Sequence, residues 1–441
     1  MIALYLFIVL FFVLYAIKNF KKSFLTFSAV SIIFNAAMAL KYSPPAISCQ
    51  LVISLFFAIS FYYQRKTYKS NEFCFFKKSF IWCCLSLLIS SLVNFIEIGS
   101  LSGLTSTIQQ YIILYVFIYI FYKVCQSFDD IKYFCKIIIS LFAIIFIYGL
   151  YEYITKTNPI LDTIMSNMPV EYAQDKLYLS DLSNLRDGRS RCQSLFSISI
   201  LYGIMSALFA FFLIYLRSLG LIKIKKIIYI LLVAFSLFGC YACNSKTALV
   251  ALPIFIIPLL LKNKLLLMLD VIICFVLLLI PDVVLNIIGN FIDLRAFDAK
   301  DNSVEGSSLY LRLIQLNASL ELWLRSPIFG NGLRSAAMFA DKGYDVFGAE
   351  SVWFRLMIEQ GMFGLISYLS LIGAFIKASL KAHRLKMQLL FFTIGFFVIC
   401  TITDINYTMF FMCFIVLYKL DKLHFLTIDK SSNKQYKYQP N

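Results

Sequence analysis

Residues Ile137 to Leu150 read IIISLFAIIFIYGL, a run without a single charged side chain. A second long apolar block extends from Leu265 to Pro281. The strands of a transmembrane β-barrel alternate between apolar and polar residues, and these blocks do not alternate. These stretches therefore predict an all-α fold whose helices cross a membrane.

The composition of the whole chain agrees with an integral membrane protein. Of the 441 residues, 61% are hydrophobic and only 15% are charged, whereas charged residues make up about a quarter of a typical soluble domain. A formal net charge of +16 would suggest nucleic acid binding in a soluble protein, but here the basic residues must first be distributed across a bilayer. We therefore expect no nucleic acid partner and interpret the charge as information on topology.

Hydropathy divides the chain into membrane passes and two long connections. A helix needs roughly 20 apolar residues to cross the bilayer core, so we expect about 12 to 14 transmembrane helices, and the pattern places thirteen. They begin near Ile2, Phe24, Ile47, Ser79, Ser106, Tyr133, Leu195, Ile227, Thr247, Leu265, Val352, Met387 and Tyr407. The expected parts are N-terminal membrane helices (1–154), a first long outer loop (155–194), central membrane helices (195–284), a second, partly helical outer loop (285–351), C-terminal membrane helices (352–420) and a basic tail (421–441).

The distribution of charge tests this topology. With the N-terminus outside and the C-terminus inside, the inner segments hold 26 of the 40 Lys and Arg residues and 6 of the 24 acidic residues. The inner side then carries +20 and the outer side −4, as the positive-inside rule requires. Only Asp270 and Asp404 are expected to approach the membrane interior.

Three arginines lie within six residues at the end of the first long outer loop, in the run Arg186-Asp-Gly-Arg189-Ser-Arg191. The positive-inside rule disfavours arginine on this side of the membrane. One interpretation is a solvated turn that pairs with nearby acids and lipid headgroups. The other is an anion clamp, because a guanidinium presents a planar fork of donors that matches phosphate oxygens.

The second long outer loop contains the pattern of an amphipathic helix. Two serines can cap its start at 307 and 308, and Pro327 ends it. Arg312, Gln315 and Ser319 share one face of this helix because they are three and four residues apart. Leucines recur at helical spacing on another face. We expect the helix to lie along the outer interface or over a cavity.

Other polar residues lie at the outer ends of membrane helices. The turn Gly330-Asn331-Gly332 has two glycines, which let a backbone approach a ligand closely. Glu350 is the last carboxylate before the helix of Val352, where it is either a charge favoured by the helix dipole or a general base. Lys246 is either a lysine that extends out of the bilayer or an anion contact. Cys240-x-x-Cys243 has the spacing of a redox pair, but without a soluble βαβ context we interpret it as two small apolar residues.

These residues, in this order, resemble the bacterial family of O-antigen polymerases and O-antigen ligases over roughly the C-terminal two thirds of the chain. The similar segments are Arg189-Ser-Arg191-Cys-Gln-Ser, Asn244-Ser245-Lys246-Thr247-Ala248-Leu249, Arg312 to Gly332, and Glu350-Ser351 through Glu359-Gln-Gly361-Met-Phe-Gly364-Leu. The family tends to have Arg where this chain has Lys246. The resemblance implies a GT-C-like architecture in the bacterial inner membrane, with both long loops in the periplasm.

The resemblance also implies a reaction. One undecaprenyl-pyrophosphate-linked saccharide donates its chain to a hydroxyl of an acceptor, which is a second lipid-linked repeat unit in a polymerase. Arg191 and Arg312 would bind the pyrophosphate and stabilise its developing charge, and Glu350 would accept the hydroxyl proton. Arg186, Arg189, Lys246, Gln315 and Asn331 would contact the substrate. No metal and no cofactor are expected, and the expected partners are lipid-linked oligosaccharides, membrane lipids and a chain-length regulator protein.

Two alternatives stay open on the sequence. The ligases, which join the polymer to the lipid A core, carry His where this chain has Glu350. Both histidines here, His383 and His424, lie on the expected inner side, which disfavours a His-dependent ligase. A lipid-linked oligosaccharide flippase or another transporter also fits the composition. Such proteins have charged residues in mid-membrane and repeat symmetry. Here only Asp270 and Asp404 are expected to approach the membrane interior, which disfavours a transporter.

Overall fold

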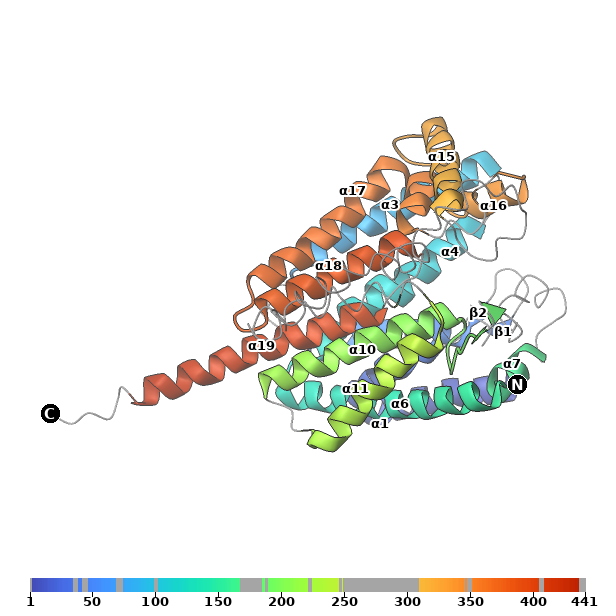
Figure 1. The fold of residues 1–441 in the computed structure, drawn as a ribbon. Helices are drawn as coiled ribbons and strands as arrows, with labels where there is room; N and C mark the ends of the chain where they lie inside the picture. Colours follow the sequence, from blue (N-terminus) through green and yellow to red (C-terminus); the bar gives the residue numbers. More distant parts are fainter. Residues whose placement is uncertain are drawn as a thin grey trace, which may run out of the picture.

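A computed structural model (Figure 1) describes residues 2–34, 39–41, 47–68, 74–98, 102–166, 185–186, 189–220, 224–245, 248, 309–344, 346, 351–403 and 408–435. Long helices dominate these residues, and five of the described helices are long and apolar enough to cross a membrane. The all-α, polytopic membrane fold expected from the sequence is confirmed. The only strands among the described residues form two short antiparallel hairpins.

The elements, in chain order, are α1 (Ile2–Val30), η1 (Ser31–Ile33), β1 (Ala39–Lys41), β2 (Ile47–Ser48), α2 (Cys49–Gln64), α3 (Lys77–Ile98), α4 (Ser102–Gln110), the π-helix η2 (Tyr111–Val116), α5 (Phe117–Val124), α6 (Phe128–Thr155), α7 (Pro159–Ser166), β3 (Leu185–Arg186), β4 (Arg189–Ser190), α10 (Ser199–Leu219), α11 (Lys226–Ala242), α15 (Leu309–Arg325), α16 (Ser335–Asp341), α17 (Val352–Leu380), α18 (Lys386–Ile402) and α19 (Thr408–Gln435).

The first helix, α1, is two arms rather than one rod. Asn19 leaves the helical region at φ −155°, ψ 90°, and its side-chain oxygen accepts from the Lys22 N–H at 2.9 Å, which caps the second arm. The Ser23 hydroxyl donates to the carbonyl of Phe12 at 3.0 Å. These residues are eleven apart and could not meet along a straight helix. The chain therefore reverses within the lysine-rich segment where the sequence predicts a turn.

Eleven of the thirteen expected passes coincide with a described helix or arm. The other two, expected from Thr247 and Leu265, lie almost entirely outside the described residues. The observed start of a helix differs from the expected one where a capping interaction sets it. Helix α6 begins five residues before the expected Tyr133, because Ser127 and Asp130 form a reciprocal capping box. Helix α19 continues to Gln435, past the expected membrane boundary at 420.

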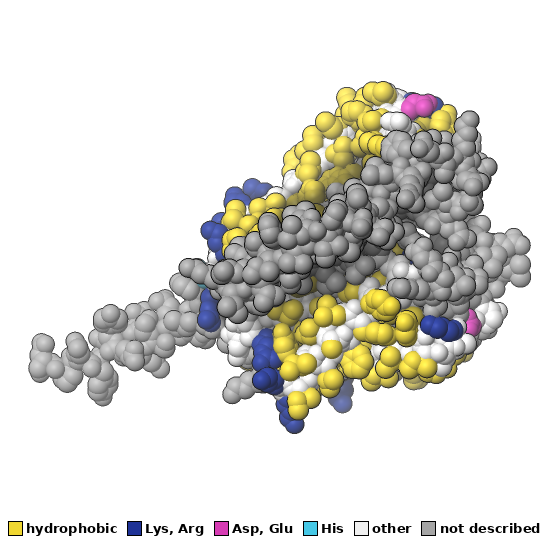
Figure 2. Space-filling view, in the orientation of Figure 1, with side chains coloured by type: hydrophobic (Ala, Val, Ile, Leu, Met, Phe, Trp, Pro, Cys, Tyr) yellow, Lys and Arg dark blue, Asp and Glu magenta, His cyan; other side chains and the backbone are white. Residues whose placement is uncertain are grey.

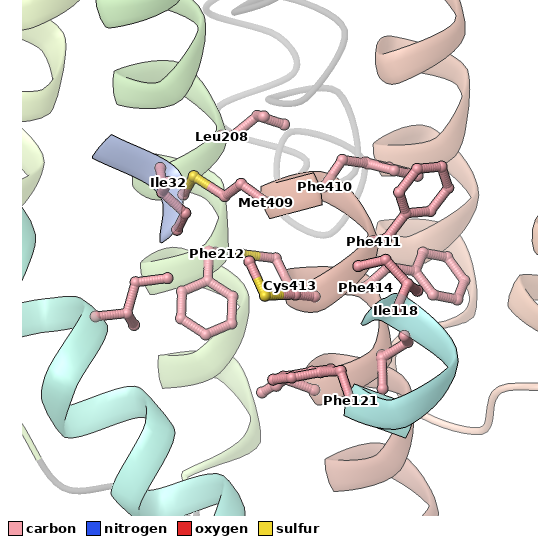
Figure 3. Close-up of a cluster of buried hydrophobic side chains, with 14 of the residues drawn as sticks. Ile32, Ile118, Phe121, Leu208, Phe212, Met409, Phe410, Phe411, Cys413 and Phe414 are labelled. Atoms are coloured by element: carbon pink, nitrogen blue, oxygen red, sulfur yellow. The ribbon is translucent and has the colours of Figure 1, made fainter. Parts of the chain in front are cut away.

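The larger of two buried hydrophobic clusters in the described residues is rich in aromatic side chains and joins the N-terminal and C-terminal helices. The smaller cluster holds α15, α16 and the first arm of α17 together through Leu322, Phe339 and Ile358. Helix α19 packs against α10, α18 and α5, and its residues from Met409 to Leu417 are all buried. Figure 3 shows Phe212 of α10, Phe121 of α5 and Cys413 of α19 in this cluster. A helix that is apolar all round is either a membrane span or buried by other helices, and this part of α19 is buried by other helices.

Charge distinguishes the two ends of the bundle. Lys and Arg side chains gather at the end where α10 and α17 finish and α11 and α18 begin (Figure 2). Arg217 and Lys377 lie in the last turns of α10 and α17. We call this the basic end. The N-terminus, α7, α15 and α16 lie at the opposite end, here called the outer end, whereas the C-terminus lies beyond the basic end (Figure 1).

Two buried charges of α19 fix the connections at the basic end. Lys419 donates to the carbonyls of Tyr122 and Cys125 at 2.6 and 2.8 Å, which satisfies the end of α5. The Asp421 carboxylate accepts from the backbone N–H groups of His383, Arg384 and Leu385 at 2.6, 2.8 and 2.9 Å. These contacts tie the connection between α17 and α18 to α19.

Replacement of Asp421 should therefore destabilise the protein. Asp421→Ala leaves three backbone donors without their acceptor, at a cost of about 3 kcal/mol or more. Asp129→Ala, in the exposed first turn of α6, removes a carboxylate that contributes at most about 1 kcal/mol. Thermal unfolding of the purified protein in detergent should show a much larger fall in Tm for Asp421→Ala. Equal melting temperatures for the two variants would contradict the anchoring role.

Candidate functional site

The first two arginines of the outer run occupy opposite backbone positions in a hairpin, and their side chains lie outside the described part of the structure. Strands β3 and β4 pair with Leu185 opposite Ser190 and Arg186 opposite Arg189. The two residues between the strands are Asp-Gly, a sequence that favours tight hairpin turns. Like charges directly opposite each other are unfavourable in an antiparallel pair. A shared anion would offset that repulsion, so the pairing is compatible with the expected anion clamp.

The chain after β4 is held by a buried carboxylate. Glu152, at the end of α6 and 2% exposed, accepts from the N–H groups of Gln193 and Ser194 at 3.0 and 2.5 Å. The Asn158 amide donates to the carbonyl of Ser194 at 2.9 Å. These bonds fix the backbone directly after Arg191, whose own side chain is partly exposed.

The same segment contacts the end of α11. The N–H of Cys192 donates to the carbonyl of Ala242 at 3.0 Å. Burial raises the pKa of the Cys243 thiol to about 11, although the nearby Ser245 N–H and the Arg191 charge lower it. The structure therefore brings Arg191 next to the turn that begins at Asn244. Lys246 itself lies outside the described residues.

The thiols near this contact do not have the character of a redox pair. Cys240 and Cys243 are free and buried, and burial likewise raises the pKa of Cys192 to about 12. A reactive Cys-x-x-Cys pair requires a lowered pKa and access to solvent. The interpretation of these cysteines as small apolar residues is favoured.

Helix α15 turns its polar face toward the protein. Gln315 and Ser319 are 2% and 1% exposed, whereas Leu320 and Leu324 of the other face are 37% and 68% exposed. Arg312 belongs to the same helix, three residues before Gln315, but its side chain lies outside the described part of the structure, so its place on this face stays a prediction. Because α15 packs against α17, this face is directed at the start of the next membrane helix.

Helix α17 is broken at Gly361, which has φ +61° and ψ −156°. This region of backbone conformation is essentially restricted to glycine. A break inside an apolar helix frees backbone donors and acceptors, which must find other partners when water is excluded. The segment Pro327–Gly332 supplies most of them.

Four backbone hydrogen bonds join this segment to the break. The N–H groups of Met362 and Phe363 donate to the carbonyls of Pro327 and Ile328 at 2.9 and 3.0 Å. In the opposite direction, the N–H groups of Asn331 and Gly332 donate to the carbonyls of Ile358 and Glu359 at 2.8 and 3.1 Å. The hydroxyl of Ser90 on α3 also donates to the Glu359 carbonyl, at 2.7 Å. We call Pro327–Gly332 the bridging turn.

The glycines of the bridging turn serve a backbone contact. A Cβ at Gly330 would lie 2.4 Å from the carbonyl carbon of Glu359, and one at Gly361 would lie 2.6 Å from the nitrogen of Gly330. The sequence suggests that Gly330 and Gly332 allow a ligand to approach. In the described structure the group that approaches is the backbone of α17.

Asn331, between the two glycines of the bridging turn, also takes part in the contact with α17. Its side chain is 7% exposed, and its amide nitrogen donates to the carbonyls of Leu322 and Ile358 at 2.8 and 3.1 Å. It thereby joins α15 to the first arm of α17. A direct contact of Asn331 with substrate stays a prediction.

A small polar cavity of about 50 Å³ lies beside the break. Its wall includes Arg355, Glu359, Gln360, Tyr115 and Tyr368. Arg355 Nε lies 3.2 Å from the carboxylate of Glu359, which is 2% exposed. The expectation that only Asp270 and Asp404 approach the membrane interior is therefore wrong for α17. The missed signal is an Arg and a Glu four residues apart, which can pair on one face of a helix.

The expected general base lies at the edge of the described residues. Helix α17 begins at Val352 as predicted, and the Ser351 hydroxyl caps it by accepting from the Trp353 N–H at 3.3 Å. Glu350 immediately precedes this cap and is itself outside the described residues. A group of three or more potential metal ligands is absent from the described part of the chain.

One family model matches the chain. Residues 231–369 match the model of the family described as O-antigen ligase. The match covers most of α11, all of α15 and the bridging turn, and most of α17, and it supports the superfamily of O-antigen polymerases and ligases that the motifs indicate. It favours neither of the two activities over the other. No curated protein matches the chain.

The close contact at the bridging turn can be tested by adding one methyl group. Gly330→Ala should lower Tm and the yield of folded protein, because a Cβ cannot fit against the backbone of Glu359. The matched control is Gly373→Ala on α17, where nothing lies within 4 Å of the added Cβ. The control should be neutral or more stable by about 0.5–1 kcal/mol. Wild-type stability of Gly330→Ala, measured by thermal unfolding in detergent, would show that the contact is not formed.

Proposed function

We propose that this multi-pass membrane protein is an O-antigen polymerase that acts on the periplasmic side of the bacterial inner membrane. It transfers the saccharide chain of one undecaprenyl-pyrophosphate donor to the terminal sugar of another lipid-linked repeat unit. The observation that carries the proposal is the arrangement of the outer segments. Arg191 lies between the β3–β4 hairpin and the backbone that Glu152 anchors, and Arg312 belongs to α15, the helix that packs against the broken helix α17.

The proposed reaction is a single glycosyl transfer. The oxygen of the acceptor hydroxyl forms a bond to the anomeric carbon of the donor, and the bond from that carbon to the pyrophosphate oxygen breaks. The lipid pyrophosphate leaves with the bonding electron pair, and the hydroxyl proton passes to a base. The two groups that the protein must provide are donors for the leaving phosphate and an acceptor for the proton.

The outer arginines suit the leaving group. Each guanidinium can donate two parallel hydrogen bonds to phosphate oxygens, and Arg191 and Arg312 are assigned that role. Arg186 and Arg189 are cross-strand partners, so one anion can be shared between them and relieve their repulsion. Lys246 and Gln315 complete the proposed substrate contacts, while Asn331 supports them by joining α15 to α17.

Glu350 is assigned as the base. It comes directly before the capping residue of α17, at the water boundary of the proposed periplasmic side. The positive end of the helix dipole favours the carboxylate form there, so it can accept a proton at neutral pH.

The histidines favour polymerase over ligase. His383 lies between α17 and α18, where its N–H donates to Asp421 at the basic end. His424 lies beyond Asp421 in α19, on the part of the helix that leads to the C-terminus. A ligase of the kind implied by the resemblance would use a histidine at the position of Glu350.

Conservative variants test the assignments. Arg191→Lys, Arg312→Lys and Glu350→Gln should each reduce polymer formation by about 100-fold or more, because a point charge does not replace a guanidinium fork and an amide does not accept the proton. The control is Arg325→Lys, an exposed arginine on the same helix as Arg312 that interacts with Glu321 and Tyr344. It should keep polymer formation close to wild type.

The measurement is the glycan profile of a deletion strain that carries each variant, with protein level checked by immunoblot. The deletion strain alone should show a single repeat unit on the lipid anchor. Absence of any attached unit there would indicate a ligase, and loss of periplasmic lipid-linked units would indicate a flippase. Wild-type chain lengths in all three variants would remove these residues from the mechanism.

A further inference from the structure

An apolar groove of about 420 Å³ lies between α2, α3 and the π-helix η2, separate from the outer arginines. Its volume is in the range of small-molecule sites, roughly 300–1,000 Å³. It opens on the apolar outside of the bundle, since Ile81 in its wall and the neighbouring Ile59 are half exposed. The π-helix, a rare element that often marks functional sites, contributes Tyr111 and Tyr115 to the wall.

The groove carries positive charge at one end only. Arg65 directly follows α2 and Lys77 begins α3, so both lie at the basic end, and both line the groove. The guanidinium of Arg65 lies over the ring of Tyr62, 4.5 Å from its centroid. Among the described residues, no carboxylate lines the groove or pairs with these two cations. By contrast, Lys21 at the same end is paired with Asp130 at 2.7 Å.

The length of the groove corresponds to one leaflet. It extends along α3 from Lys77 to Cys84, which is seven residues or about 10 Å of helix. Half of the hydrocarbon core is about 15 Å thick. An acyl chain that enters from the basic end therefore has an apolar channel for most of one leaflet, with two cations at the level of its headgroup.

We propose that this groove binds an anionic phospholipid of the leaflet at the basic end. The lipid phosphate would contact Arg65 and Lys77, and one acyl chain would lie against Ala58 and Tyr111. A polyprenyl pyrophosphate with its charge at the outer end would place no phosphate beside Arg65 and Lys77 and is therefore disfavoured. Tyr115 lines both this groove and the polar cavity of Arg355 and Glu359, so a bound lipid would support the wall of that cavity.

Native mass spectrometry of the full-length protein, purified in detergent with added phosphatidylglycerol or phosphatidylcholine, tests the site. We expect retention of phosphatidylglycerol over phosphatidylcholine. A basic residue beside an anionic headgroup contributes roughly fivefold in affinity, so the double variant Arg65→Gln, Lys77→Gln should lose roughly 25-fold. The charge-matched control Lys132→Gln, Lys136→Gln changes two exposed lysines of α6 and should retain the lipid.

A second pair of variants tests the groove without changing charge. Ala58→Trp fills the groove and should abolish phosphatidylglycerol retention, whereas Ile59→Trp, on the exposed neighbouring position, should not. Equal retention of the two lipids by the wild type would identify only non-specific surrounding lipid and overturn the proposal. Unchanged phosphatidylglycerol retention in both the Arg65→Gln, Lys77→Gln variant and Ala58→Trp would also overturn the proposal. Preferential retention of undecaprenyl pyrophosphate over phosphatidylglycerol at this groove would overturn it as well. These measurements do not depend on enzymatic activity.

Discussion

The break of α17 at Gly361 is the constraint on which the outer end depends. A membrane helix cannot leave its backbone groups without partners, and here the bridging turn Pro327–Gly332 provides donors and acceptors for both arms. That pairing holds the connection between α15 and α16 against α17. It also brings the polar face of α15 against the first arm of α17. One set of backbone hydrogen bonds thus joins the segment after α15, the helix that includes Arg312, to the first arm of α17, the helix that Glu350 precedes in the sequence.

In other parts of the bundle, buried charged side chains provide hydrogen-bond partners for free backbone groups. Glu152 accepts from two backbone N–H groups after Arg191, Asp421 accepts from three between α17 and α18, and Lys419 donates to two carbonyls at the end of α5. In each case a side chain on a long helix satisfies a connection that lacks regular structure. Burying a charge is favourable only with such partners. The rigid helices thereby determine the course of the segments that carry the proposed site.

Hydropathy predicted the passes because the apolar blocks are long and lysine or arginine lies at their expected inner ends. The sequence also predicted α15, since Pro327 ends it and its polar residues share a face. The break in α17 could not be predicted, because a helix tolerates an isolated glycine such as Gly361 and nothing local to it requires a break. Its cause is a contact with Gly330, thirty-one residues away. For the same reason the glycines of the bridging turn suggested a ligand, when the approaching group is another part of the chain.

The central claim is that the outer arginines and Glu350 serve transfer from a lipid pyrophosphate to a second lipid-linked unit. The most direct measurement uses the purified full-length chain in lipid vesicles, supplied only with undecaprenyl-pyrophosphate-linked repeat units. The account predicts lipid-linked chains of two or more units and the release of one undecaprenyl pyrophosphate for each unit joined. Intact single units after incubation with correctly folded protein, or transfer of the saccharide only to a lipid A core acceptor, would contradict it.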